Sequence, residues 1–300
     1  MTADLPSDLV QGFQVEASGL RGRLVQLGPV VDEIIGRHGY PEPVAALLAE
    51  ALVLAATLAS ALKFDGIFTL QTRGDGPVSM LVADYRTPGT LRGYAQVDLD
   101  KLEAALARED QRLGSVPRLI GAGHLAFTVD QGEHTERYQG IVELTGATLA
   151  ECAHRYFQQS EQIGTGIRVA AGRVDGRWRA GGLMLQRLPS DNPNLPVDEA
   201  TEDAWRRAVI MMSSARDDEL LDPGLQPTTL LFRLFHEDGV RVWDPTPVVF
   251  GCRCSTERVQ GVLRSFTVDE IRDMSVDGQI SVTCEFCSTR YEFPATDFLP

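Results

Sequence analysis

Lysine and cysteine are both scarce in this sequence. Only two of its 28 basic residues are lysines, Lys63 and Lys101, and only five of its 300 residues are cysteines. The formal net charge is −14, which opposes binding to nucleic-acid phosphates and to anionic membranes. Residues 1–6 lack the basic segment and apolar run of a secretory signal. We therefore expect a cytoplasmic protein without nucleic-acid or membrane partners, whose thiols stay reduced unless they bind metal or sense oxidants.

One apolar run, from Val44 to Leu62, is long enough to cross a membrane. Eight of its 19 residues are alanine, however, and Glu50 would lie well inside a bilayer, where a carboxylate is costly. Prolines precede the run and Lys63-Phe64-Asp65-Gly66 ends it, as is typical of a helix. The run is predicted to be a helix buried in a protein core.

The sequence contains no nucleotide-binding motif, paired catalytic carboxylates or serine nucleophile motif. Gly74-Asp75-Gly76-Pro77 is predicted to be a hairpin turn, because no helix and no lysine follow it as they would in a phosphate-binding loop. Cys152 and His154 are two residues apart, so on a helix they point to different sides and form no nucleophile–base pair. Cys152 is predicted to be a buried structural thiol, and no enzyme activity is expected.

Residues 1–189 are predicted to form an α+β core domain of a mixed sheet and helices. Short β-rich runs bounded by Gly, Pro or Asp predict strands at Gly22–Leu27, Gly66–Gln71, Val78–Ala83, Leu91–Val97, His124–Val129, Tyr138–Leu144 and Leu183–Leu188. Helices are predicted at Val30–His38, Pro43–Leu62, Leu102–Glu109 and Thr148–Gln159.

Residues 190–249 are predicted to form a helical, acidic linker. The segment begins with a polar, proline-rich stretch at 190–196, and residues 190–222 contain nine acidic residues and three arginines. Helical spacing places the apolar side chains of this segment on two faces. These are Trp205, Ala208, Val209 and Met212, and then Leu230, Leu231, Leu234 and Phe235. We expect both faces to pack on the core domain in the reduced protein, but only weakly, because charge and proline surround them.

Four of the five cysteines form two close pairs, Cys252-Arg253-Cys254 and Cys284-Glu285-Phe286-Cys287. Four thiolates form a soft tetrahedral site suited to Zn²⁺. Two thiolates in a CxC motif repel each other, and without metal they are readily oxidised. The pattern therefore predicts structural zinc, either alone or combined with redox chemistry; other metals and permanent disulfides stay open. His236 is a less favoured replacement ligand, since four thiolates are available.

Residues 250–300 are predicted to form a small zinc-binding domain, because a unit of about fifty residues rarely folds without a staple. Zinc binding contributes about 10–16 kcal/mol of apparent free energy in small zinc peptides, so loss of zinc should unfold this domain. A thiol–disulfide oxidoreductase is the first alternative, but its CxxC motif would begin a helix, whereas Tyr291–Pro294 is predicted to complete a hairpin. A nucleic-acid-binding zinc ribbon is weakened by the five arginines and eight acidic residues of this segment.

Several motifs together resemble the redox-regulated holdase chaperones known as the thirty-three-kilodalton heat-shock proteins. The resemblance covers nearly the whole chain and is most specific at the two cysteine pairs. It also includes residues 62–66, 74–77, 156–162, 181–186, 234–236 and 242–254. Gly164 departs from the family pattern, in which proline is usual, and places one turn in doubt.

The resemblance implies an ATP-independent holdase that is inactive while Zn²⁺ is bound by Cys252, Cys254, Cys284 and Cys287. Oxidation would form Cys252–Cys254 and Cys284–Cys287 disulfides, release zinc and unfold the linker. The active form would be a homodimer that binds unfolding client proteins, and cellular thiol reductants would reverse the change. The candidate client-binding residues in the linker are Trp205, Val209, Met212, Leu231 and Phe235.

Overall fold

The computed structural model describes residues 7–107, 115–132, 135–161, 163–187 and 199–299. Contacts divide the chain into two compact units, Met1–Phe250 and Gly251–Pro300. The predicted α+β class is confirmed: two main sheets, a helical segment and a C-terminal four-cysteine cluster are all present. The helices between residues 199 and 238 belong to the first unit.

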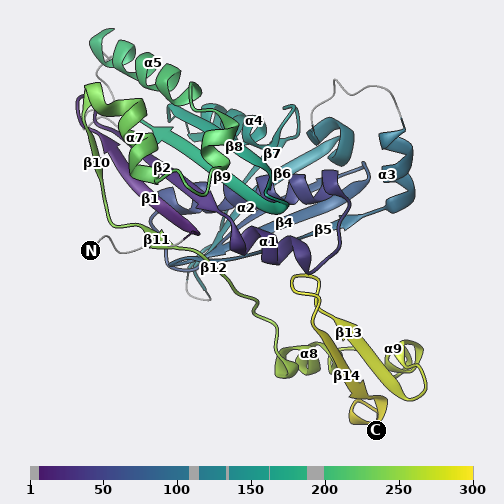
Figure 1. Cartoon of the computed structure of the whole chain (residues 1–300). Helices are drawn as coiled ribbons and strands as arrows, with labels where there is room; N and C mark the ends of the chain where they lie inside the picture. The colour runs from purple at the N-terminus through teal and green to yellow at the C-terminus, as the bar shows by residue number, and fades with distance from the viewer. Residues whose placement is uncertain (1–6, 108–114, 133–134, 162, 188–198, 300) are drawn as a thin grey trace. The chain divides into compact units, whose positions relative to one another are not determined.

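Two sheets form the framework of the first unit (Figure 1). In sheet A the strand order is β10 (Val240–Val242), β1 (Leu9–Val15), β2 (Leu20–Leu27), β9 (Arg177–Gln186) and β8 (Thr165–Val174), and β11 (Thr246–Pro247) also pairs with β1. In sheet B the order is β12 (Val249–Phe250), β5 (Thr90–Val97), β4 (Val78–Arg86), β3 (Ile67–Gly74), β6 (Gly123–Asp130) and β7 (Tyr138–Glu143). Most neighbouring strands are antiparallel; β12 pairs with β5 in parallel.

Helix α2 (Glu42–Ala61) forms the centre of the core and contacts strands of both sheets. Glycines permit this close approach. A Cβ at Gly93 of β5 would lie 2.9 Å from Leu52 Cδ2, and a Cβ at Gly182 of β9 would collide with Thr57. The helix is long and apolar enough to cross a membrane, but 78% of its apolar window is buried inside the protein. It is therefore a core helix, as predicted.

Shorter helices complete the core around α2. These are α1 (Pro29–Gly36), α3 (Leu99–Leu106), α4 (Leu149–Tyr156) and two π-helical turns, η1 (Val116–Ile120) and η2 (Phe157–Glu161). The buried carboxylate of Glu50 on α2 accepts a hydrogen bond of 2.9 Å from the backbone N–H of Leu149 at the start of α4. Burial raises the pKa of this carboxyl group above its ordinary value. Glu50 thus anchors α4 to the central helix.

A second helical layer covers the face of sheet A opposite α2 (Figure 1). It consists of α5 (Glu199–Ser213), α6 (Asp217–Leu221), α7 (Pro227–Phe235) and the 3-10 turn η3 (His236–Asp238). Strand alternation explains the two faces: Leu183 and Leu185 of β9 pack against this layer, whereas Met184 belongs to the α2 core. Sheet A therefore has two buried faces.

The second unit contains α8 (Thr256–Leu263), α9 (Val268–Met274), a hairpin of β13 (Gln279–Thr283) and β14 (Arg290–Pro294), and the 3-10 turn η4 (Ala295–Asp297). Its buried apolar cluster is small and consists of Leu263, Ile271, Ile280, Phe293 and Ala295. The predicted hairpin is present. Both helices were missed, because only the hairpin and the cysteine motifs of this segment carried a recognised signal.

All seven predicted strands overlap observed strands, and the four predicted helices overlap α1, α2, α3 and α4 with η2. Leu188, residues 108–109 and the linker stretch 190–196 lie outside the described residues. Strands β1 and β8 were not predicted. The sequence of β8 is rich in Gly and Ala, so it lacks the bulky alternation that marks a strand. Gly164 causes no break, because its carbonyl accepts a 2.9 Å hydrogen bond from the Arg187 backbone N–H.

Substitution of Leu52 by alanine tests the central position of α2. Leu52 is fully buried, so Leu52→Ala should lower the free energy of unfolding by about 2–5 kcal/mol through lost burial and an unfilled cavity. Leu99→Ala is the matched control, since Leu99 is 60% exposed and its loss should change stability by less than about 0.5 kcal/mol. Equal effects of the two substitutions in urea unfolding would contradict this packing.

Candidate metal centre

The two cysteine motifs come together in the second unit. The Sγ atoms of Cys252, Cys254, Cys284 and Cys287 all lie within 4.8 Å of one another. Cys252 Sγ lies 3.7 Å from Cys284 Sγ, and Cys254 Sγ lies 3.4 Å from Cys287 Sγ. No disulfide joins any of the cysteines, all of which lie among the described residues. The arrangement is a four-thiol cage.

Turn geometry presents the CxxC sulfurs. Cys284 follows β13 directly, and its backbone N–H donates to Thr289 O at 2.9 Å while its carbonyl accepts from the Ser288 N–H at 2.8 Å. Ser288 has a positive φ of 56°, which turns the chain back into β14. This tight connection holds the sulfurs of Cys284 and Cys287 on the same side of the hairpin end.

Contacts at the start of α8 hold the sulfurs of the CxC motif in place. Ser255 caps this helix by accepting the Arg258 backbone N–H, and the Arg258 guanidinium donates to the Arg253 carbonyl at 2.7 Å. The loop between Cys252 and Cys254 is thereby fastened to a helix on its C-terminal side. The residue between the two cysteines contributes its carbonyl to this bond.

Hydrogen bonds to sulfur tune the cage. Burial would raise the pKa of the Cys252 thiol, but the Cys254 backbone N–H and the neighbouring thiols lower it to about 7. Burial raises the pKa of Cys284 to about 12, although the Phe286 and Cys287 N–H groups oppose the rise. Burial and the hydrogen bonds among the four sulfurs thus shift the pKa values of Cys252 and Cys284 in opposite directions. A divalent cation bound by all four would displace the remaining protons.

A phenol contacts the same cage from β14. The Tyr291 hydroxyl donates a hydrogen bond to the Cys254 sulfur, and this bond raises the pKa of Tyr291 to about 12. Such contacts orient metal ligands and tune their basicity. Sequence reasoning counted Tyr291 only as an apolar group of this unit. Tyr291 and buried Phe293 are two residues apart on β14 and therefore lie on the same face of the strand.

The cage fits Zn²⁺. Zinc–sulfur bonds of about 2.3 Å at tetrahedral angles place sulfur atoms about 3.8 Å apart, close to the observed 3.7 and 3.4 Å. The four donors are all soft sulfur atoms, which suits zinc better than calcium or magnesium. These four cysteines would hold the ion and leave no open coordination position, as in structural rather than catalytic zinc sites.

The remaining candidate ligands lie elsewhere. Cys152 is buried in the α2 core, as the sequence predicted, and burial raises the pKa of its thiol. His236 belongs to the first unit, where its Nδ1 lies 3.1 Å from the Phe232 carbonyl oxygen. The four predicted cysteines thus come together without either residue.

The five candidate client-binding residues all lie in the helical layer on sheet A. Met212, Leu231 and Phe235 are buried in its apolar cluster, and Trp205 packs against that cluster while half-buried. Val209 is also half-buried and lies over Gly166 of β8. The predicted helical face of α5 is confirmed, since Met212 and Val209 both point to this strand.

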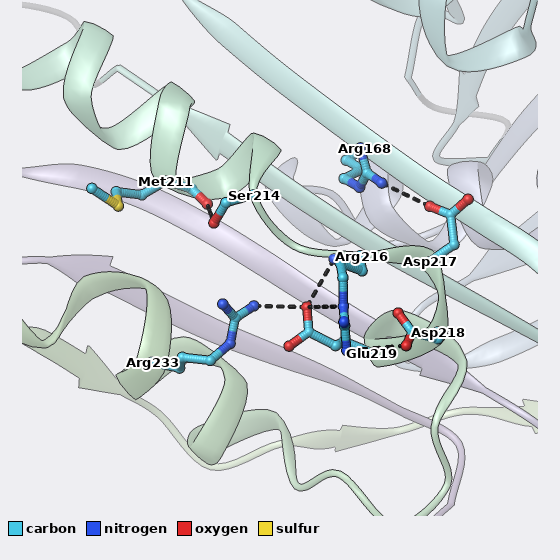
Figure 2. Close-up of polar contacts among 8 residues, drawn as sticks. All are labelled: Arg168, Met211, Ser214, Arg216, Asp217, Asp218, Glu219 and Arg233. Carbon is cyan, nitrogen blue, oxygen red and sulfur yellow. Dashed lines mark hydrogen bonds and ion pairs between the residues drawn. The ribbon is translucent and has the colours of Figure 1, made fainter.

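Ion pairs surround this layer (Figure 2). Arg168 of β8 contacts Asp217 of α6 at 2.8 Å, and Arg233 of α7 contacts Glu219 of α6 at 2.8 Å. Asp217 is 69% exposed and Arg233 45%, so each pair contributes at most about 1 kcal/mol. Apolar contacts must therefore supply most of the stability of the layer.

Comparison with known proteins identifies relatives over nearly the full chain. The model of the Hsp33 protein family matches residues 8–294. A 33 kDa chaperonin of Caulobacter vibrioides (strain NA1000 / CB15N) is 45% identical over 290 residues, which cover 95% of this chain and 94% of the relative. A 33 kDa chaperonin of Pseudomonas fluorescens (strain SBW25) is 38% identical over 297 residues, which cover 98% and 93%.

A solved structure has the same fold. The crystal structure of the 33 kDa chaperonin (heat shock protein 33 homolog) from Thermotoga maritima superposes with a TM-score of 0.81 and covers 97% of this chain and 96% of that chain. The sequence identity of 24% makes this a statement about the fold alone.

Removal of one cage sulfur tests the metal site. Cys252→Ser should weaken zinc binding by at least about a hundredfold, since even residues that only orient zinc ligands contribute 10–100-fold. Competition with a chromophoric chelator measures this affinity in the reduced protein. Cys152→Ser and His236→Ala are controls that should retain the parent affinity. Unchanged affinity of Cys252→Ser would exclude Cys252 as a ligand.

Proposed function

Because this chain belongs to the Hsp33 family of chaperonins, which are not enzymes, we propose that it is a redox-regulated, ATP-independent holdase chaperone. The observation that best supports this proposal is the four-thiol cage in a unit with a very small apolar core. In the reduced protein, the four cysteines hold Zn²⁺ and keep this unit folded. The chaperone is inactive in that state, with α5–α7 packed on sheet A.

Oxidation and metal binding exclude each other. A disulfide requires two sulfur atoms at about 2.05 Å, whereas sulfurs that share a tetrahedral zinc lie about 3.8 Å apart. Two equivalents of peroxide accept four electrons from the four thiolates and are reduced to water. The products are the Cys252–Cys254 and Cys284–Cys287 disulfides and free Zn²⁺. Without its metal the second unit unfolds, because its five-residue apolar cluster is too small to hold it.

Unfolding of the second unit affects the first unit through the polypeptide that connects the two. Cys252 follows β12 after one residue, and β12 pairs with β5 only at Val249 and Phe250. A two-residue strand of this kind separates at little cost. β10 and β11, which precede it, hold the end of the helical layer against β1. Loosening of β12 is therefore passed through β11 and β10 to the helical layer.

The helical layer is held unevenly. Only Ala208 and Met212 of the 15-residue α5 are buried, whereas α7 buries Pro227, Leu230, Leu231, Leu234 and Phe235. Phe235 also stacks on Phe13 of β1 with ring centroids 5.7 Å apart. Few buried contacts mean a low free energy of local opening. We expect α5 to leave the sheet before α7.

Client binding then uses the uncovered apolar surface. Departure of the layer exposes Phe13, Leu24, Leu183 and Leu185 on sheet A, together with the linker residues Trp205, Val209, Met212, Leu231 and Phe235. An apolar face of this size binds the exposed apolar segments of unfolding proteins. The oxidised chaperone acts as a homodimer in the cytoplasm, and cellular thiol reductants return it to the zinc-bound form. Nucleic acid and membranes are not partners.

The alternative function, a thiol–disulfide oxidoreductase, receives no support from the site. Its CxxC motif would lie at a helix N-terminus, where the helix dipole stabilises a thiolate. Here Cys284 and Cys287 lie at the end of the β13–β14 hairpin. Burial raises the pKa of Cys284 to about 12, which disfavours it as an attacking thiolate at neutral pH.

One oxidation experiment tests the proposal as a whole. Bound zinc and suppression of client aggregation are measured on the reduced protein before and after peroxide treatment at raised temperature. Zinc loss and a gain of activity are expected together, and peptide mass mapping should find the two disulfides. Cys152→Ser should respond like the parent. A gain of activity with zinc retained, or reduced protein that holds no zinc, would overturn the switch.

A methionine pair tests the role of α5. Met212 is 3% exposed and Met211 is 37% exposed, so Met212→Ala removes the main anchor of α5 while Met211→Ala does not. Met212→Ala should suppress client aggregation partly in the reduced, zinc-loaded protein, and proteolysis within α5 should accelerate. Met211→Ala should behave like the parent. Accelerated proteolysis of Met212→Ala without any client binding would separate linker release from activity and contradict this step.

A further inference from the structure

Basic side chains gather in one cleft of this strongly acidic protein. A cavity of about 160 Å³ at the C-terminal end of α2 is lined by four cations, and none of its other lining residues among those that the structure describes is acidic. The cations are Arg21, Arg23, Lys63 and Arg187. An adjoining cavity of about 360 Å³ shares Arg21 and Arg23, and one acidic residue, Asp244, lines it.

Three of these charges have no acidic partner among the described residues. Arg187 forms an ion pair of 2.9 Å with Glu202. Arg23 donates only to backbone carbonyls, to Ser60 at 2.9 Å and Gly22 at 2.8 Å. Burial and the nearby Arg21 charge both lower the pKa of Arg23, as expected when like charges meet without compensation.

The fold explains why a positive charge lies at Arg23, but it does not explain the charges of Arg21 and Lys63. Its bond to Ser60 O satisfies a carbonyl at the C-terminal end of α2, where a cation is favoured by the helix dipole. The exposed side chains of Arg21 and Lys63 form no hydrogen bond or ion pair with any described residue. Two further cations beside a desolvated guanidinium cost stability unless an anion joins them.

Aromatic side chains line the adjoining cavity beside the basic residues. The Arg23 guanidinium and the Trp243 ring both lie over Gly12 of β1, where an added Cβ would be 3.7 Å from Arg23 Nη1 and 3.3 Å from Trp243 Cε3. Trp243 is 45% exposed, and Tyr85 lines the same cavity. Tyr85 is buried, so Trp243 is the exposed ring; one such ring beside a cationic pocket suits a ligand that carries a planar group next to its charge.

We propose that this cleft binds the phosphoanhydride chain of a small molecule, either free pyrophosphate or a nucleoside diphosphate. Converging arginine and lysine side chains match the several oxygens and multiple charges of such a chain better than a single carboxylate. The small enclosed volume and the net charge of −14 disfavour a long polyanion such as RNA.

Calorimetric titration of the reduced, zinc-loaded full chain with sodium pyrophosphate and with ADP tests this site. Lys63→Gln and Arg21→Gln should each weaken binding about tenfold, the effect of losing one charge-assisted contact. Lys101→Gln is the matched control, because Lys101 is the only other lysine and is 61% exposed. Affinity should also fall as salt is raised. Zinc chelation by pyrophosphate is common to all variants and cancels in the comparison.

The two probes distinguish the sources of the phosphate chain. Equal affinities for pyrophosphate and ADP would mean that the site recognises only the phosphoanhydride chain. Tighter binding of ADP that is lost in Trp243→Leu would mean that the site recognises a nucleotide. Absence of binding by either probe would overturn the proposal. Equal affinities of Lys63→Gln, Arg21→Gln and Lys101→Gln would do so as well, because binding would then not depend on the cleft.

Discussion

The four cysteine thiols that lie within 4.8 Å of one another form the arrangement on which, we propose, the second unit depends through a shared metal ion. The buried apolar cluster of residues 251–300 has five members, and no disulfide connects its helices and hairpin. Zinc binding in small peptides is worth about 10–16 kcal/mol, which exceeds the net stability of many whole domains. The same sulfurs are chemically labile once the metal leaves. A fold held in this way is as sensitive to oxidants as its ligands are.

The first unit contrasts two ways of covering a sheet. Helix α2 buries 14 of its 20 residues between sheets A and B, and Gly93 and Gly182 let it approach both. Helix α5 buries two of 15 residues on the opposite face of sheet A. One face of sheet A is therefore permanent core. The other is covered by a layer whose removal leaves the α2 core intact, and this difference makes reversible exposure of apolar surface physically reasonable.

The sequence predicted features whose signals are local. The CxC and CxxC spacings predicted the cage, and the apolar run with Glu50 predicted a core helix. The apolar faces of α5 and α7 were also visible as helical periodicity. Strand β8 was invisible, because its glycines and alanines are explained only by the helix packed on it. Tyr291 was missed as a cage contact for a similar reason, since its role depends on a sulfur 37 positions earlier in the chain.

The contact between α5 and β8 explains how a layer can be both specific and easily released. A Cβ at Gly166 would lie 2.8 Å from Met212 Cε, the far end of a flexible side chain, so the glycine lets Met212 lie close against the strand. Methionine is flexible and adapts to such a gap through dispersion contacts, which need no hydrogen bonds to be broken on release. Residues 190–222 also carry a net charge of −6, from nine acidic residues and three arginines. Repulsion among these charges would favour the separation that we propose, and the contact at Gly166 would oppose it.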